Sequence, residues 1–219
     1  MKNLFATTAF ALAAFAPVAA LAQFSMPSVP GLGKSSGAAN ADVVGQGDAL
    51  VRNYVAANKE VLNANGKMLA ALGLKEKAAT ADSTANAMSG GATEGSLSDS
   101  NKVVADTGGA IASELAKKPV LDAGAKAVFA AGLVHLVNGG VKYAGLGKDV
   151  KDMGSSLKGA SPLQMAKLSS AAWVVSKFPG SASDLYNTLK VAIDFAREQN
   201  IPIPSNSNDA MAAIGAANS

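Results

Sequence analysis

The stretch from Pro119 to Leu146 constrains the fold of this chain more than any other part of it. It reads PVLDAGAKAVFAAGLVHLVNGGVKYAGL, and most of its side chains are alanine, glycine, valine or leucine. A helix that is apolar around most of its circumference lies either at the centre of a bundle or in a membrane. The choice between these two positions decides the class of protein.

Polar residues and glycines interrupt this stretch, namely Lys126, His135, Asn138, Gly139, Gly140 and Lys142. The two adjacent glycines are expected to bend or end the helix, with a separate short helix or pair of turns over residues 145–159. The uninterrupted apolar run, residues 127–134, is far shorter than the roughly 20 residues that span a bilayer. We therefore predict a buried central helix and no transmembrane span in the mature chain, with weak contact at a membrane surface as the alternative.

Small residues recur along one side of this predicted helix. Ala123, Ala127 and Ala131 are four residues apart, and Gly124 and Gly132 lie beside them. Small side chains at this spacing allow a second helix to approach closely. Either a neighbour fills this ridge of small residues or the ridge leaves a pocket.

The N-terminus has the three parts of a secretory signal peptide. Lys2 supplies the positive charge, Leu4 to Ala16 are mainly apolar, and Ala20-Leu21-Ala22 is a small-x-small cleavage signal. We predict that residues 1–22 are removed and that the mature chain starts at Gln23. The short positive region favours a bacterial protein of the periplasm or the cell exterior.

The composition excludes several kinds of chemistry. The chain has no cysteine, so it has no disulfide and no thiolate metal site. With only one histidine, a zinc site is not expected either. The formal net charge of +3 is too small to argue for a nucleic-acid partner. We predict no cofactor, no metal and no nucleic acid.

The apolar residues of the rest of the chain recur at spacings of three, four and seven, and no stretch alternates as a strand does. We predict an all-α fold, an irregular bundle of about five to six helices around the apolar central helix, with no sheet. The helical domain covers residues 42–204. A disordered leader over 23–41 precedes it, a flexible loop at 89–100 interrupts it, and a flexible tail over 205–219 follows it.

Glycine, proline and serine mark several helix ends. Gly73 is expected to stop the first long helix. Ser161–Pro162 predicts a helix start, with serine as the cap and proline at the first position. Pro179–Gly180 is expected to end that helix, and Ser183 to cap a last helix that runs to about Asn200.

Five residues are candidates for lining a ligand pocket. Asn58 and Asn65 lie seven residues apart on the apolar face of the first helix, where they either fix the register of the bundle or line a wet cavity. His135 has no partner among its helical neighbours, which favours a structural histidine over one that senses pH or contacts a ligand. Trp173 and Tyr186 belong either to a core cluster or to a wall that stacks on a ligand.

No catalytic set can be assembled from the residues present, so we do not expect an enzyme. The leading hypothesis is an exported helical protein that binds or scaffolds something in the bacterial cell envelope. Its partner is unknown, with another envelope protein or an apolar ligand as the candidates. One alternative is a periplasmic carrier of an apolar small molecule or lipid, with its cavity between the central and first helices. A second alternative is a membrane-active protein.

Overall fold

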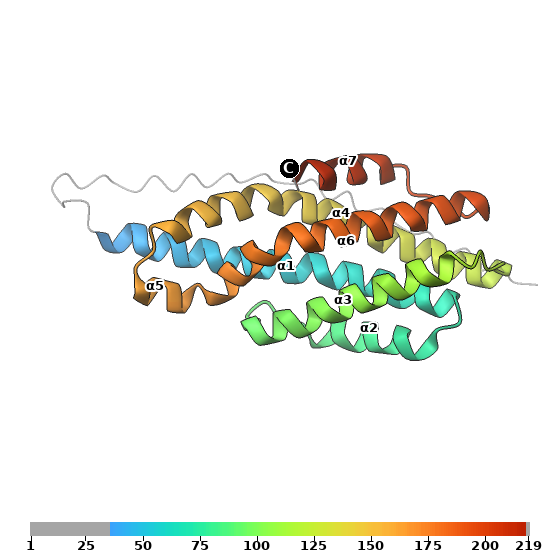
Figure 1. Cartoon of the computed structure of the whole chain (residues 1–219), viewed down its shortest axis with the longest axis horizontal. Helices are drawn as coiled ribbons and strands as arrows, with labels where there is room; N and C mark the ends of the chain where they lie inside the picture. The colour runs from blue at the N-terminus through green and yellow to red at the C-terminus, as the bar shows by residue number, and fades with distance from the viewer. Residues whose placement is uncertain (1–35, 218–219) are drawn as a thin grey trace, which may run out of the picture. The chain divides into compact units, whose positions relative to one another are not determined.

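The computed structural model describes residues 36–217, and these form seven α-helices and no strand (Figure 1). This confirms the all-α prediction. The predicted signal peptide lies outside the described residues. The helices are α1 (Ser36–Ala71), α2 (Lys75–Ala87), α3 (Glu94–Leu115), α4 (Ala123–Lys158), α5 (Pro162–Lys167), α6 (Ser169–Glu198) and α7 (Ser207–Ala217).

Four of the long helices form a central bundle. Helix α4 packs against α1 on one side and α6 on the other, and α3 packs against both α6 and α1. Helix α2 covers α1 and α3, whereas α7 covers α4 and α6. The chain runs one way along α1, α3 and α6 and returns along α2, α4 and α7 (Figure 1). The apolar helix α4 is therefore central, as the sequence predicts.

Glycines of α4 allow α1 to approach closely. A Cβ atom added to Gly132 would stand 2.8 Å from Met68 Cγ and 3.0 Å from the backbone oxygen of Ala64. A Cβ added to Gly139 would stand 2.9 Å from Val61 Cγ2. These distances are shorter than van der Waals contacts, so no larger side chain fits. Of the predicted ridge of small residues, only Gly132 receives α1. Ala123, Gly124, Ala127 and Ala131 are exposed, so the prediction that a helix packs closely along the whole ridge is wrong.

A second pair of glycines on α4 receives α7. A Cβ on Gly140 would stand 2.8 Å from Ile214 Cδ1, and one on Gly147 would stand 2.8 Å from Ala217 Cβ. The sequence predicts a flexible tail over 205–219, and the structure instead holds α7 in most of it. The apolar face of this short helix is too weak a signal alone, but it packs into the notch that the two glycines leave.

Helix α4 does not end at Gly139–Gly140, so the prediction of a helix end there is wrong. Each glycine costs the helix roughly 1 kcal/mol relative to alanine. Both are buried against neighbouring helices, and this packing offsets the cost. The helix starts at Ala123 rather than at Pro119, because the Asp122 side chain accepts a hydrogen bond of 2.8 Å from the backbone N–H of Ala125. It then continues through residues 145–158.

The continuity of α4 removes one argument against a membrane span. Among the described residues, α4 is the one helix whose length and composition would allow it to cross a bilayer. In the bundle, 39 % of its most apolar stretch is buried. The central helix of a water-exposed bundle meets the same criterion, so the finding is weak evidence for a span. That the mature chain has no span stays a prediction.

Pro179 lies inside α6, so the predicted helix end at Pro179–Gly180 is wrong. Proline lacks the backbone N–H that a helix interior uses, at a cost of about 3 kcal/mol. Phe178 and Ala182 are buried on either side of it, and Leu185 follows one turn later. Burying side chains of this kind stabilises the fold by roughly 1.5–3 kcal/mol for each large one. The packing of α6 on both sides of the proline therefore outweighs the local penalty.

Two predicted helix ends are confirmed. Helix α1 stops just before Gly73, which has a positive φ of 80°, and the N–H of Leu74 donates to the Leu69 carbonyl at 2.8 Å. This is the glycine-based C-terminal cap. Ser161 caps α5 in a reciprocal capping box with Gln164.

The connection between α2 and α3 is shorter than the flexible loop predicted at 89–100. Thr93 caps α3 by accepting a hydrogen bond from the N–H of Ser96 at 3.3 Å, so the helix begins at Glu94. Leu97 is fully buried and fixes the first turns of α3 to the core. At the other end of the domain, α1 starts at Ser36 rather than at 42.

Candidate functional site

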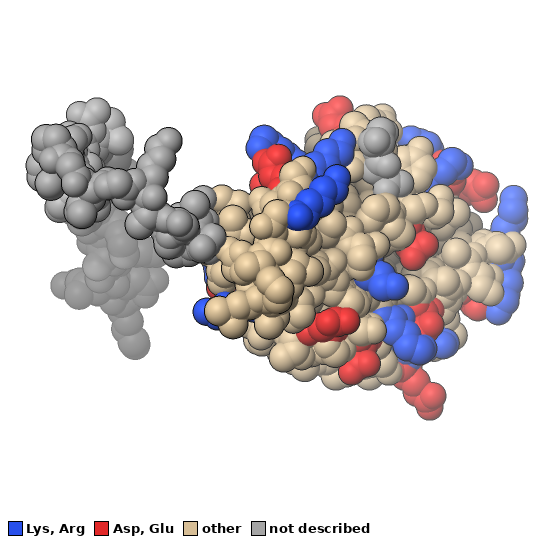
Figure 2. Space-filling view, turned by 60° about the vertical axis from the view of Figure 1, so that its left-hand side comes forward, with Lys and Arg blue, Asp and Glu red and all other residues tan. Residues whose placement is uncertain are grey.

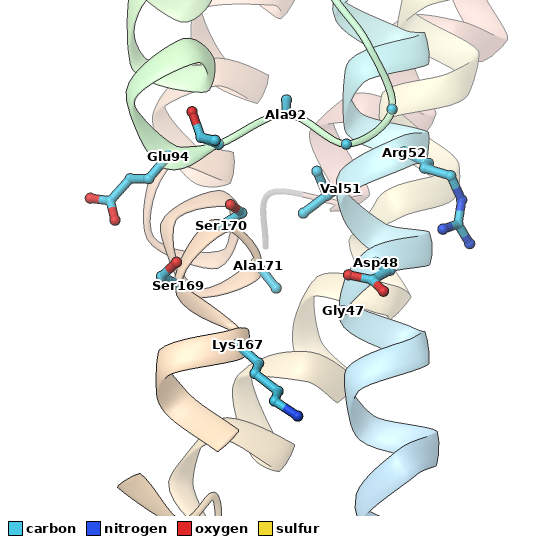
Figure 3. A pocket seen from close by; sticks show the side chains of 13 residues that line it. Gly47, Asp48, Val51, Arg52, Ala92, Glu94, Lys167, Ser169, Ser170 and Ala171 are labelled. Carbon is cyan, nitrogen blue, oxygen red and sulfur yellow. The ribbon is translucent and has the colours of Figure 1, made fainter. Parts of the chain in front are cut away.

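A cleft of about 440 Å³ lies where α1, the α2–α3 connection, α5 and the start of α6 meet (Figure 3). At one side of it, Gly47 of α1 permits close approach, because a Cβ at this position would stand 2.5 Å from Leu168 Cδ2 and 3.3 Å from Ala171 Cβ. The junction between α5 and α6 therefore sits directly on α1. Val51 and Ala171 are buried and supply apolar walls. We call this feature the end cleft.

The α2–α3 connection covers the opposite side of the end cleft. A Cβ on Gly90 would stand 3.0 Å from Arg52 Cγ, so the connection lies on the aliphatic stem of this arginine. Long basic side chains commonly pack their stems on neighbours and leave the charged group in water. Figure 3 shows the guanidinium group of Arg52 pointing away from the cleft. The glycine thus holds the connection close to α1.

Charged side chains of both signs line the end cleft. Asp48 and Glu94 are acidic, and Arg52 and Lys167 are basic. None of the four forms an ion pair with another described residue. In Figure 3, the side chain of Lys167, the last residue of α5, points toward the space beside α1. These charges are free to pair with groups of a bound molecule.

Backbone donors are also free around the end cleft. The N–H groups of residues 89–91 donate to no described protein group. Helix α6 starts without a side-chain cap, so the N–H groups of Ser169, Ser170 and Ala171 likewise have no acceptor among the described residues. The first N–H groups of a helix have no partner inside the helix and need one outside it. Gly90, Gly91, Ser169, Ser170 and Ala171 line the end cleft, so their N–H groups are candidate donors for a bound molecule.

Helix α5, which ends at the cleft, contains no buried residue. Leu163 is 73 % exposed and Met165 is 39 % exposed. Isolated exposed apolar residues are common, but here two bulky ones occupy a single short helix beside a cleft. The sequence identifies the start of α5 and misses its exposure, because exposure depends on what packs against the helix.

Charges on the face that carries this end of the bundle are interspersed. Figure 2, in which the end with α5 comes forward, shows Lys and Arg mixed with Asp and Glu and separated by uncharged surface. A single-sign field attracts a polyanion or polycation, whereas mixed charges do not. Recognition on this face therefore depends on local contacts.

Two of the predicted pocket residues, Asn58 and Trp173, are buried in one aromatic layer of the core. Tyr143 donates a hydrogen bond to Asn58 Oδ1 at 2.8 Å, while Asn58 Nδ2 has no partner among the described residues. The ring of Tyr54 lies edge-on to both Tyr143 and Trp173, at centroid distances of 5.7 and 6.0 Å. Burial raises the pKa of Tyr143 well above its ordinary value. These residues form a packed layer between α1, α4 and α6.

The hydroxyl of Tyr54 extends this layer to α3. It donates to Asn101 Oδ1 at 2.9 Å, and Ser181 Oγ donates to the same oxygen at 2.9 Å. The layer thus joins all four helices of the central bundle by directional bonds. Polar groups with specific partners disfavour other registers of the same helices.

Asn65, His135 and Tyr186 lie in three other places. Asn65 is buried on α1 and donates to Thr107 Oγ1 at 2.8 Å. It also lines a second cavity, between α3 and α6. Tyr186 is half-buried on α6. The structure does not gather the five candidate residues around one pocket.

His135 faces Glu60 of α1 across the outer edge of the α1–α4 interface. Its Nδ1 lies 2.8 Å from Glu60 Oε2, and Lys142 Nζ lies 2.8 Å from the other carboxylate oxygen. Burial raises the pKa of Glu60, but the hydrogen bonds from His135 and Lys142 outweigh it and place this pKa below its ordinary value of 4.5. Glu60 is the partner that sequence reasoning missed, since it is distant along the chain.

Among residues 36–217, no group of three or more His, Asp or Glu side chains is placed to hold a metal ion. Comparison with known proteins finds no matching family, no matching curated protein and no matching solved structure. The end cleft and its neighbour α5 therefore have to be interpreted from their own chemistry.

Proposed function

We propose that the protein is an exported, non-enzymatic binding protein that holds a polypeptide segment of an envelope partner in its end cleft. The observation that carries this proposal is α5, a helix without a buried residue that presents Leu163 and Met165 to solvent beside the cleft. Exposed apolar side chains rimmed by polar groups are typical of protein–protein contact sites.

The polar groups of the end cleft favour a polypeptide over other ligands. A peptide carries backbone carbonyls for the free N–H donors of the α2–α3 connection and α6, and side chains of either charge for Asp48 and Lys167. None of the described residues that line the cleft is aromatic. Nucleobases are commonly held by stacking on such side chains. The only histidine, His135, is also absent from the lining.

Site-specific photocrosslinking in the native host tests this proposal. A photoreactive phenylalanine analogue at Leu163 is expected to give one discrete adduct, which mass spectrometry then identifies. The matched control places the analogue at Ala79, an exposed residue of α2. The same adduct should weaken when Lys167→Glu is added. No adduct at Leu163, or identical adducts at both positions, contradicts the proposal.

Contact with a membrane surface is a second candidate, favoured by a separate observation. Val120 is 88 % exposed in the α3–α4 connection, and Val128, Val134 and Val141 are all 41–49 % exposed along α4. Lys117 and Lys118 precede Val120. Liposome flotation with anionic vesicles tests this candidate, and failure to float at low salt removes it.

The carrier alternative gains no support from the contacts between α1 and α4 at Gly132 and Gly139. It places an apolar ligand between the central helix and the first helix. There, the side chains of Val61 and Met68 contact Gly139 and Gly132 directly. We therefore do not propose a ligand at that interface.

A further inference from the structure

Helix α4 presents an apolar face to solvent along most of its length. Among the described residues, six large apolar side chains are exposed, and four of them are valines on α4 or just before it. Only 39 % of the most apolar stretch of the helix is buried. Contiguous exposed apolar surface marks a contact site. We call this surface the α4 outer face, and its exposed residues are Val120, Gly124, Ala127, Val128, Ala131, Val134, Asn138, Val141 and Gly145.

The α4 outer face has the repeat of a helix that packs against another helix. From Gly124 to Gly145, its exposed residues recur at alternating intervals of three and four, which is the spacing of a helix–helix seam. The first half of this seam is small, with Ala127 in its middle, and the second half contains Val134 and Val141. If a second copy of α4 packs antiparallel, the small half of one copy faces the valine half of the other.

One charged residue at each end of the α4 outer face is available to a partner. Lys118 is exposed before the face begins, and its Nζ lies 3.8 Å from the carboxylate of Glu198, which is a loose contact. Asp149 is exposed after the face ends and forms no ion pair with another described residue. The neighbouring Lys148 pairs with Asp152 of its own helix instead.

These two charges favour the antiparallel orientation. In an antiparallel pair centred on Val134, residue 118 of one copy lies level with residue 150 of the other, so Lys118 faces Asp149. In a parallel pair, Lys118 would face Lys118 and Asp149 would face Asp149. Opposite charges across an interface favour the correct partner, and like charges cost several kcal/mol. The face is therefore complementary to itself in shape and in charge.

A bilayer is a less suitable partner for the α4 outer face, although the exposed valines also favour membrane contact. Helices that lie on membranes place Trp, Phe or Leu in the apolar region. The apolar residues of this face are only valine, alanine and glycine. Asn138 lies within the seam, where a polar residue fixes the register of a helix pair, whereas lipid chains offer it no partner.

We propose that the α4 outer face is the interface of a homodimer, in which two copies of the chain pack their α4 helices antiparallel around a two-fold axis near Val134. Ala127 of each copy lies against Val141 of the other, and Lys118 pairs with Asp149. The helices overlap over roughly 45 Å and bury on the order of 1,000 Å² in total, which is near the lower limit for a specific interface. The dimer therefore dissociates on dilution. No residue of α4 lines the end cleft, so this proposal is independent of the polypeptide-binding function.

Single cysteines test the arrangement, because the chain has none of its own. With a short thiol-to-thiol crosslinker, Val134→Cys should give a covalent dimer, since this residue faces its own copy. Val141→Cys alone should give none, but a mixture of Val141→Cys and Ala127→Cys should. Ala79→Cys, on the exposed surface of α2, is the control. Crosslinking of Val141→Cys to itself indicates a parallel pair and overturns the proposal.

Sedimentation velocity over a range of concentrations measures the dimer itself. Ala131→Glu buries an unpaired charge in the seam and should raise the dissociation constant at least about tenfold, while Ala79→Glu should leave it unchanged. Lys118→Asp and Asp149→Lys should each weaken the dimer, and the double variant should restore it. A protein that stays monomeric at every concentration, whether or not it binds anionic vesicles, overturns the proposal.

Discussion

Glycine occurs at both the α1–α4 and the α3–α6 interface, but it has opposite effects on how closely the helices pack. At Gly132 and Gly139, the absence of a side chain lets α1 lie against the α4 backbone, and no space is left. In α3, Gly108 has Thr188 at contact distance, while the neighbouring Gly109 faces open space beside a cavity. Small residues permit close approach, but the opposing side chains decide whether the interface closes.

The closed α1–α4 interface also contains the stronger polar contacts. Tyr143 and Asn58 pair in its buried centre, and Glu60 joins His135 and Lys142 at its outer edge. Beside α3, Asn65 of α1 donates to Thr107, and its Oδ1 has no partner among the described residues, just as Asn58 Nδ2 has none at the α1–α4 interface. The α1–α4 interface therefore adds a charged network to close packing, but both interfaces leave one buried polar atom unpaired.

The largest effect is expected from filling the closed interface. Gly132→Leu should lower the free energy of unfolding by about 3 kcal/mol, because even its Cβ would face the immobile Ala64 carbonyl at 3.0 Å. Urea denaturation followed by circular dichroism measures this change. Gly145→Leu is the control, since Gly145 lies on the exposed face of the same helix with nothing within 4 Å. Equal stability of the two variants would contradict the close contact between α1 and α4 at Gly132.

Removing the buried hydroxyl of the same interface should cost less. Tyr143→Phe leaves Asn58 Oδ1 without its donor, and an unsatisfied buried acceptor costs about 2 kcal/mol. Tyr186→Phe is the matched control, because Tyr186 is half-buried and its hydroxyl has no described partner. Thermal and urea unfolding should show a clear loss for the first variant and a change within about 0.5 kcal/mol for the second.

At the open interface, adding a methyl group should stabilise the protein. Gly109→Ala should raise the free energy of unfolding by about 1 kcal/mol through helix propensity. Gly108→Ala gains the same propensity, but its Cβ would stand 3.0 Å from Thr188 Oγ1, so a smaller gain or none is expected. Chemical denaturation of both variants makes the comparison. A larger gain at Gly108 than at Gly109 would contradict the close contact between Gly108 and Thr188.

The smallest effect concerns the edge of the closed interface and depends on pH. The pKa of Glu60 lies below its ordinary value of 4.5 in the folded protein, so the ionised form stabilises the fold. This contribution is complete above pH 4.5 and is lost as the pH falls through the folded-state pKa. Glu60→Gln should therefore cost about 0.5–1 kcal/mol near pH 7.

Urea denaturation at a series of pH values checks this prediction. The difference between the wild type and Glu60→Gln should shrink toward zero as the pH is lowered to about 3. Asp106→Asn is a suitable control, because Asp106 forms its ion pair with Lys102 on the exposed surface of α3. A loss for Glu60→Gln that is equally large at acid and neutral pH would exclude the ion pairs as its cause.

The candidate sites could be predicted only in part. Asn58 and Asn65 stand out in the sequence because a polar residue on an apolar helix face is unusual, and both are buried. Their partners, Tyr143 and Thr107, could not be identified, since contacts between helices depend on rotation and register. The end cleft was missed because its residues come from four segments and carry no motif.

The sequence by itself determined the helical class and several helix ends. The 3.6-residue periodicity, Gly73 and Ser161–Pro162 act within a few residues of chain, so their outcome does not depend on the rest of the fold. Gly139–Gly140 and Pro179 are local signals too, yet both lie within continuous helices. Each such signal is worth only about 1–3 kcal/mol.

Only the tertiary structure decided at which positions packing outweighs these local signals. Burial of apolar side chains along the length of α4 and α6 exceeds the local penalties, and α7 packs into the notch in α4. Tertiary packing also decided which glycines are filled and which leave a cavity. That result depends on the side chains of helices far away in the sequence, and no local pattern contains it.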